Sequence, residues 1–105
     1  MLNNVCFVGR LTAEPELKKT ESGKSVVTVN IAVHNTKEDT VFIPVIFWNK
    51  QAEIMCQYCK KGKLISVQGF LKNSTYKDIQ VLRVVGVQFH MLEPKEKQEE
   101  YDILE

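Results

Sequence analysis

The sequence has little that points to a disulfide scaffold, a membrane or a secretion signal. Its three cysteines are an odd number, which argues against a framework of paired disulfides and favours the reducing cytoplasm. No apolar run approaches the ~20 residues that a membrane-spanning helix needs. The first residues show no basic region followed by a long apolar stretch, so we expect no signal peptide. A chain of 105 residues predicts one domain with one modest core.

The patterns that carry catalytic or metal chemistry are also missing. The two histidines, His34 and His90, have no Asp, Ser or Cys partner at a telling spacing. There is no glycine-rich phosphate loop, no metal-type histidine pair and no nucleophile elbow. We therefore expect a protein that is not an enzyme and that needs no metal or cofactor.

Cys56 and Cys59 form a C-x-x-C motif with two interpretations. A structural zinc site needs four ligands, but the only other cysteine is Cys6 and no histidine lies nearby in the sequence. A redox pair is expected at a helix N-terminus in a βαβ unit. These thiols instead fall late in a predicted helix, on the face that bears Ala52 and Met55. Packing on the core is the favoured interpretation, and zinc or thiol redox chemistry is the alternative.

Charge is balanced overall, with 14 basic and 13 acidic residues, but it is unevenly distributed. Residues 93–105 contain six acids and two lysines, whereas residues 1–92 carry a net charge of +5. A basic body with an acidic end suggests a polyanionic ligand, and a merely solvated domain fits the charges equally well. We expect residues 1–94 to form the domain and residues 95–105 to form an acidic, disordered tail.

Alternation of β-branched and aromatic residues with a period of two dominates the chain. It predicts five strands, at Val5–Leu11, Ser25–His34, Thr40–Trp48, Leu64–Leu71 and Gln80–Leu92. A helix is predicted over Asn49–Lys61, with Asn49 as its N-cap and Gly62 as its C′ residue. Five short strands with one helix between the third and the fourth predict an all-β OB-fold, a five-stranded Greek-key barrel.

The third predicted strand carries the most informative pattern. Its odd positions are apolar and suit the barrel interior, whereas Phe42 and Trp48 stand on the opposite face. At ~3.3 Å per residue these two rings lie ~20 Å apart along the strand. Tyr76 is a third exposed aromatic, in the tip that joins the last two strands. Pro44 has no N–H, so we expect the third strand to be unpaired there on one side.

Basic residues surround these aromatics, and Lys77 and Arg83 are among them. Rings spaced along a basic groove hold single-stranded nucleic acid by base stacking, and lysines contact its phosphates. In the opposing interpretation, Phe42 or Trp48 packs under the helix or in a subunit interface and the lysines only solubilise the chain. The candidate nucleic-acid-binding residues are Trp48, Phe42, Tyr76, Lys18, Lys50, Lys61, Lys72, Arg10, Lys60 and Lys63.

Several stretches, in their order and spacing over about residues 1–94, carry a resemblance to a known family. They are Met1–Leu11, Glu14–Lys18, Ser22–Gly23, Val45–Glu53, Lys60–Gly62, Val67–Leu71 and Phe89–Pro94. Together they resemble the single-stranded DNA-binding protein (SSB) family of bacteria and phages. No single stretch is specific, and the match rests on the whole domain.

This resemblance implies sequence-independent binding and protection of single-stranded DNA in replication, repair or recombination, at the replication fork in the cytoplasm. The three aromatics would stack on bases. The chain would form a homo-oligomer, a tetramer or a dimer. The implied interface residues are Asn3, Asn4, Val5, Cys6 and Phe7. The alternative is an OB-fold adaptor of the primosome or replication machinery that binds DNA only weakly.

The sequence departs from the family's pattern in three places. The loops Asn35–Asp39 and Asn73–Ile79 are short, so we expect a smaller site or a less complete wrap of DNA. Ile43 and Pro44 stand where the family often has polar or basic residues. The family's long linker and acidic tip are replaced by Glu99–Glu105, which resembles that tip loosely. Recruitment of replication or repair proteins through this end is one expectation, and a frayed terminus is the other.

Overall fold

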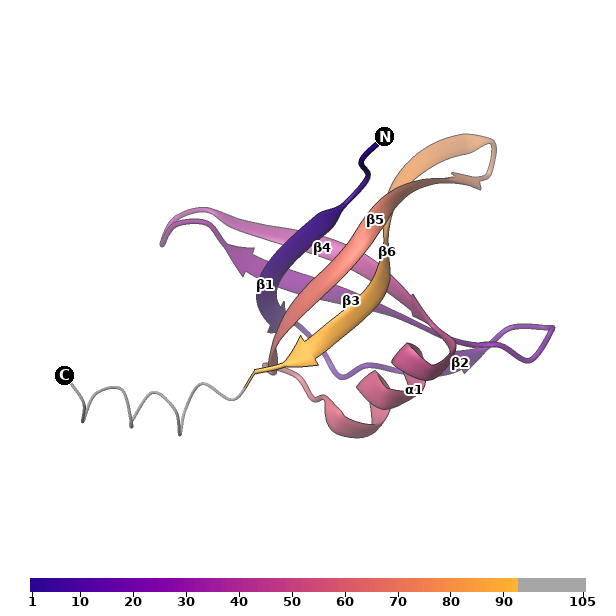
Figure 1. Ribbon diagram of the computed structural model, residues 1–105, viewed down its shortest axis with the longest axis horizontal. Coiled ribbons are helices and arrows are strands. Elements are labelled where there is room, and N and C mark those ends of the chain that lie inside the picture. Colours follow the sequence, from indigo (N-terminus) through magenta and orange to yellow (C-terminus); the bar gives the residue numbers. More distant parts are fainter. Residues whose placement is uncertain (93–105) are drawn as a thin grey trace.

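Six strands and one helix make up the computed structural model, which describes residues 1–92 (Figure 1). The predicted tail, residues 95–105, lies outside the described residues. The five long strands are β1 (Val5–Leu11), β3 (Ser25–His34), β4 (Thr40–Trp48), β5 (Leu64–Tyr76) and β6 (Ile79–Met91). A two-residue strand, β2 (Lys18–Lys19), was not predicted, and the helix α1 (Asn49–Tyr58) lies between β4 and β5.

The strands close into a ring in the order β1-β5-β6-β4-β3, with β2 on the outer side of β3 and with β1 also pairing with β3. Every pairing is antiparallel except that of β4 with β6. The five long strands, with the helix between the third and the fourth of them, form the OB-fold, so the predicted fold class is confirmed. Two long hairpins, β3–β4 and β5–β6, project in different directions from the barrel (Figure 1).

The hydrophobic core fills the ring and the space beneath the helix. The rings of Phe47 in β4 and Phe89 in β6 meet edge to face, with centroids 5.5 Å apart. Helix α1 lies against β3, β4 and β6, and its Ala52 and Met55 are fully buried. Aromatic pairs of this geometry add ~0.5–1.5 kcal/mol to the effect of their burial.

The inward face of β4 follows the predicted alternation only near the helix. Val45 and Phe47 are fully buried, as predicted. Ile43 is half-buried, and Val41 is 40% exposed. The prediction that the odd positions all face the interior is therefore wrong for Val41, because this end of β4 continues past the barrel in the β3–β4 hairpin.

The helix begins and ends differently from the prediction. Its N-cap is Trp48, not Asn49, and no side chain caps its first turn. Trp48 is still paired with Val26 of β3, so the chain turns into the helix through a positive φ of 57° at Asn49, a residue type that tolerates this region. The helix ends at Tyr58 rather than Lys61. Cys59 is extended and buried in the core.

The residues after the helix form a turn of their own. Gly62 is not the C′ residue of α1, because three residues separate it from the helix end. Its φ of 89° instead serves the turn that leads into β5. No helix within residues 1–92 is both long and apolar enough to cross a membrane.

The β5–β6 hairpin is longer than predicted. The predicted fourth strand ends at Leu71, but β5 continues to Tyr76, which pairs with Ile79. Lys77 and Asp78 make a two-residue turn with φ of 50° and 64°, as a turn of type I′ requires. The outer part of this hairpin exposes both of its faces, so it carries no apolar alternation that a sequence pattern could detect.

Candidate nucleic-acid interface

Three aromatic side chains project from the barrel surface. Phe42, Trp48 and Tyr76 are 59%, 38% and 61% exposed. Phe42 and Trp48 share the outer face of β4, where they pair with Ala32 and Val26 of β3. The alternative in which these rings pack beneath the helix does not occur. The two rings mark the ends of a strand face that is ~20 Å long.

Tyr76 lies at the end of β5 and faces the same side of its hairpin as Lys72 and Arg83. Lys72 is paired with Arg83, and Tyr76 follows Lys72 at an even spacing along the strand. The ammonium nitrogen of Lys77 lies 5.4 Å from the centroid of the Tyr76 ring. This cation–π contact leaves the opposite face of the ring for a base.

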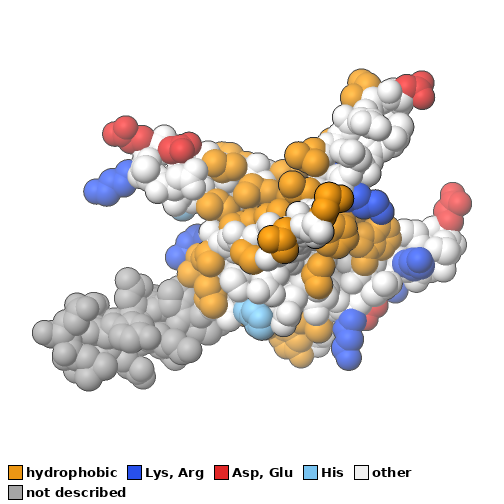
Figure 2. Space-filling view, turned by 45° about the horizontal axis from the view of Figure 1, so that its top comes forward, with side chains coloured by type: hydrophobic (Ala, Val, Ile, Leu, Met, Phe, Trp, Pro, Cys, Tyr) orange, Lys and Arg blue, Asp and Glu red, His pale blue; other side chains and the backbone are white. Residues whose placement is uncertain are grey.

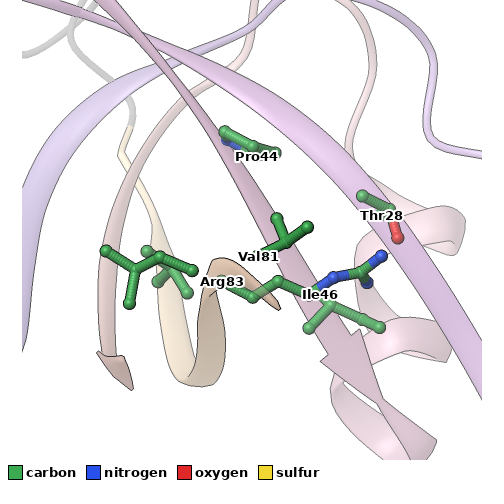
Figure 3. A pocket seen from close by; sticks show the side chains of 7 residues that line it. Thr28, Pro44, Ile46, Val81 and Arg83 are labelled. Carbon is green, nitrogen blue, oxygen red and sulfur yellow. The ribbon is translucent and has the colours of Figure 1, made fainter. Parts of the chain in front are cut away.

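A groove of about 190 Å³ separates β4 from the β5–β6 hairpin (Figure 3). The β4–β6 ladder consists of Val45 and Ile46 paired with Val84 and Val85. The ladder ends beside Pro44, which has no N–H to donate, so the expectation that β4 is unpaired there on one side is confirmed. Before Val84, β6 stays with β5 and leaves β4, which opens the groove.

Two predicted lysines lie beside Trp48. Lys18 of β2 pairs with Val26, which pairs with Trp48, so all three side chains share one face. Two strand spacings of ~4.8 Å place Lys18 about 10 Å from the Trp48 strand position. Lys50 follows in the first turn of α1. Both lysines are exposed, and within residues 1–92 neither side-chain ammonium group has a hydrogen bond or an ion pair.

The neighbouring Lys19 has a structural role instead. Its ammonium nitrogen donates to the hydroxyl of Ser25 at 2.7 Å. Ser25 is buried and donates in turn to Glu53 of α1, also at 2.7 Å. This chain of bonds ties β2 and β3 to the helix.

The turn between α1 and β5 is a second location, where four further predicted basic residues gather. Nη1 of Arg10 donates to the carbonyl oxygen of Gly62 at 2.9 Å. The backbone N–H of Lys61 donates to Glu14 at 3.2 Å. Lys60 and Lys63 belong to the same turn. The structure thus divides the predicted basic residues among the surroundings of Trp48, the β5–β6 hairpin with Lys72, and this turn, and their contact with nucleic acid stays a prediction.

A second hollow, of about 260 Å³, adjoins the groove and shares Thr28 with it. Lys18 and Val26 line it, together with the carboxylates of Glu14 and Glu16. Negative charges repel a phosphate, so this hollow suits a nucleic-acid backbone less well than the groove does.

Cys56 on α1 and Cys59 just after its end have the environment of packed side chains. Burial raises the pKa of the Cys56 thiol. Burial also raises the pKa of Cys59, against a smaller lowering by the charge of Lys63. A thiol with a raised pKa is a poor nucleophile and a poor metal ligand at neutral pH. No group of three or more His, Cys, Asp or Glu within residues 1–92 is placed to hold a metal ion.

The predicted interface residues lie on and just before β1. The side-chain amide of Asn3 bonds within its own chain, donating to the carbonyl oxygen of Leu71 at 2.8 Å and accepting from its N–H at 2.9 Å. Along β1, one edge pairs with β5 from Val5 to Arg10, while β3 pairs only with Arg10 and Leu11. Within residues 1–92, the second edge from Val5 to Gly9 therefore has no partner strand. Figure 2 shows hydrophobic side chains gathered between the two long hairpins.

The family of the chain follows from its relatives. Residues 2–92 match the Single-strand binding protein family. The chain belongs to this family. The "Single-stranded DNA-binding protein" of Enterococcus faecalis is 37% identical over 95% of this chain, and "Single-stranded DNA-binding protein 2" of Streptococcus agalactiae serotype III is 39% identical over 90%. "Single-stranded DNA-binding protein A" of Bacillus subtilis is 40% identical, also over 90%.

The chain is shorter than these family members. It spans 59% of the Enterococcus protein, 80% of the Streptococcus protein and 62% of the Bacillus protein. The sequence pattern does not indicate the groove. It predicts Arg83 as one of the basic residues around the aromatics but not as a binding candidate, and it singles out none of Thr28, Ile46 and Val81. The one signal that pointed to the groove was Pro44.

Proposed function

We propose that the chain binds single-stranded DNA without reading its sequence and protects it during replication, repair or recombination. The supporting observation is the row of exposed aromatics, Phe42 and Trp48 on one strand face and Tyr76 on the adjoining hairpin, with lysines beside them. Every base has a π face, so each ring stacks on any base and contributes ~1–3 kcal/mol. We propose no catalytic step.

The lysines supply the second part of the binding energy. Lys18, Lys50 and Lys72 are exposed, and none of their ammonium groups has a hydrogen bond or an ion pair within the described part of the chain. Contact with phosphates releases the counterions of the DNA, so the affinity should fall as salt rises. Arg10, Lys60, Lys61 and Lys63 would contact a longer strand that continues to the turn between α1 and β5.

Trp48 is the only tryptophan of the chain, so its fluorescence reports on the proposed site. Adding oligo-dT at low salt should change this fluorescence, and raising the salt should reverse the change. Phe42→Ala keeps the reporter and should weaken binding by ~1–3 kcal/mol. Tyr58→Ala is the matched control, because Tyr58 is also 59% exposed but lies on α1, and it should bind as the wild type does.

Unchanged Trp48 fluorescence with oligo-dT at low salt would contradict DNA binding at this face. It would favour the alternative, an adaptor of the replication machinery with weak DNA affinity. Equal losses in Phe42→Ala and Tyr58→Ala would show that the outer face of β4 has no special role.

We further propose that copies of the chain associate through the unpaired edge of β1, as a tetramer or a dimer, and act at the replication fork in the cytoplasm. A free strand edge is a template for pairing with another chain. Asn4 and Cys6 are exposed, and Val5 and Phe7 are half-buried against the core, so both faces of the strand could join an interface. Recruitment of other proteins by residues 95–105 is a separate proposal that rests on their acidic sequence.

A further inference from the structure

Strand β2 consists of two lysines, and the structure gives them different surroundings. Lys18 and Lys19 follow each other along the strand, so their side chains stand on opposite faces of it. Lys18 shares the outer face with Trp48, because both residues pair with Val26. Lys19 pairs with Ser25 on the opposite face, where the Ser25 side chain is buried. The two side chains are chemically identical, so their own chemistry does not decide which of them stands beside Trp48.

The hydroxyl of Ser25 connects two opposite charges. It accepts a hydrogen bond from the ammonium group of Lys19 at 2.7 Å and donates to Oε2 of Glu53 in α1, also at 2.7 Å. Hydrogen bonds with a charged partner are stronger than those between neutral groups. Ser25 is only 2% exposed, so water cannot readily replace a partner that is lost. These bonds therefore favour the arrangement in which Lys19, and not Lys18, occupies the inner face.

A strand of two residues has few backbone hydrogen bonds with which to fix its register. A slip by one residue would turn each side chain to the other face of the strand. Leu17 or Lys19 would then stand opposite Val26 in place of Lys18. Of the two β2 side chains, only that of Lys19 has a hydrogen bond within residues 1–92. Its bond to Ser25 is therefore the polar side-chain contact that opposes such a slip.

We propose that Ser25 and Glu53 are positioning residues for DNA binding, because they hold Lys19 on the inner face and so present Lys18 to the phosphates next to a base stacked on Trp48. The inference rests on the proposed function and names residues that act in it without touching DNA. It gives the two lysines unequal roles, since Lys18 contacts a phosphate and Lys19 does not.

Acylation of lysines by the N-hydroxysuccinimide ester of acetic acid, followed residue by residue with mass spectrometry, tests this arrangement. Without DNA, Lys19 should react more slowly than Lys18, because its ammonium group is hydrogen-bonded. Oligo-dT at low salt should slow the reaction of Lys18 and leave that of Lys19 unchanged. Ser25→Ala removes the hydroxyl without changing any charge, and it should abolish both differences. Ser22→Ala is the matched control in the same hairpin, and it should keep them.

The salt dependence of oligo-dT binding gives a second measurement. One phosphate contact on a single strand contributes ~0.7 to the slope of log affinity against log salt concentration. Lys18→Met should reduce the wild-type slope by this amount. Ser25→Ala should reduce it equally, although it keeps every charge, and the double variant should lose no more than either single variant.

Glu53 allows the same test from an exposed position, so the result does not depend on how well the core accepts Ser25→Ala. Glu53→Ala removes the acceptor of the Ser25 hydroxyl and should lower the salt slope. Glu53→Gln keeps an oxygen that can accept this bond, and it should restore the wild-type slope and the difference between the two lysines.

Two results would overturn the positioning role. One is equal protection of Lys18 and Lys19 by oligo-dT in the wild type. The other is a wild-type salt slope in both Ser25→Ala and Glu53→Ala. Failure of the wild type to bind oligo-dT at all would instead reject the proposed function, and it is told apart because the slower acylation of Lys19 needs no DNA.

Discussion

Side chains of one chemical type have different roles here because of the face on which they stand. Phe42 and Phe47 are both in β4, five residues apart, yet one is 59% exposed and the other is fully buried. Period-two alternation is enough to separate them, so the sequence predicts the aromatic face correctly. It does not predict the direction of Arg83, because that depends on where β6 leaves β4 in space.

Cys56 and Cys59 should make stability depend on pH in the alkaline range. Burial raises the pKa of both Cys56 and Cys59 above the ordinary 9.0. Between the unfolded and the folded pKa, the unfolded chain has released these protons and the folded chain still holds them, so unfolding becomes easier as the pH rises. The stability that the protonated thiols contribute should be complete below about pH 9 and should be lost as the pH rises through their folded pKa values.

Urea unfolding at a series of pH values measures this effect. The variant Cys56→Ala/Cys59→Ala should show a smaller fall in the free energy of unfolding between neutral and alkaline pH than the wild type does. The variant should also be less stable at neutral pH, because Cys59 fills part of the core. This difference does not affect the comparison, which concerns only how steeply the free energy of unfolding falls with pH. Identical slopes in the two proteins would mean that neither thiol is held protonated by the fold.

At the scale of the strands, Gly86 allows β6 to pass close to the core. A Cβ at this position would meet the ring of Phe47 in β4. Gly86 has no positive φ, so alanine is compatible with the backbone and the cost is purely steric. Gly86→Ala should lower the free energy of unfolding by ~1–3 kcal/mol, as overpacking a core does.

Chemical denaturation of a double-mutant cycle checks this prediction. Phe47→Leu makes room for the added methyl group, so Gly86→Ala should cost less in that background than in the wild type. If the two substitutions add independently, the contact between Gly86 and the ring is not the reason for the glycine.

The elements could be predicted wherever one face is buried and the other is not. This holds for β1, β3 and the barrel part of β4, whose bounds match the sequence pattern. It fails for the outer part of the β5–β6 hairpin, which is exposed on both faces and has no Gly in its turn at Lys77 and Asp78. It also fails at the helix start, where the pairing of Trp48 with β3 overrides the capping preference of Asn49.

At the scale of the whole molecule, one edge of β1, from Val5 to Gly9, has no partner strand within residues 1–92 and is open to pairing with a second copy of the chain. Two copies related by a two-fold axis would each bring the same edge, so one substitution changes the interface twice. Cys6→Asp places a charge on this exposed strand, and the two charges of a pair would repel each other. The mass in solution, measured by light scattering, should fall from that of an oligomer toward that of one chain.

Gln57→Asp is the control, because Gln57 is exposed on α1, away from β1, and the mass should not change. A wild-type mass of a single chain would contradict association altogether. A Cys6→Asp variant that keeps the wild-type mass would place the interface elsewhere on the surface.

Two short strand pairings, β1 with β3 and β4 with β6, close the barrel, and they determine where it should open most easily. Only two residue pairs join β1 to β3, and only two join β4 to β6, whereas β5 and β6 are paired over most of their length. We therefore expect the sheet of β1, β5 and β6 and the sheet of β2, β3 and β4 to open at these two short pairings, and the one amide proton of Val84 and Val85 that faces β4 should exchange with deuterium by local opening rather than by global unfolding. A DNA strand bound across the groove would hold β4 and β6 together. Slower exchange at the amide that faces β4 on binding would show that the ligand holds the barrel shut.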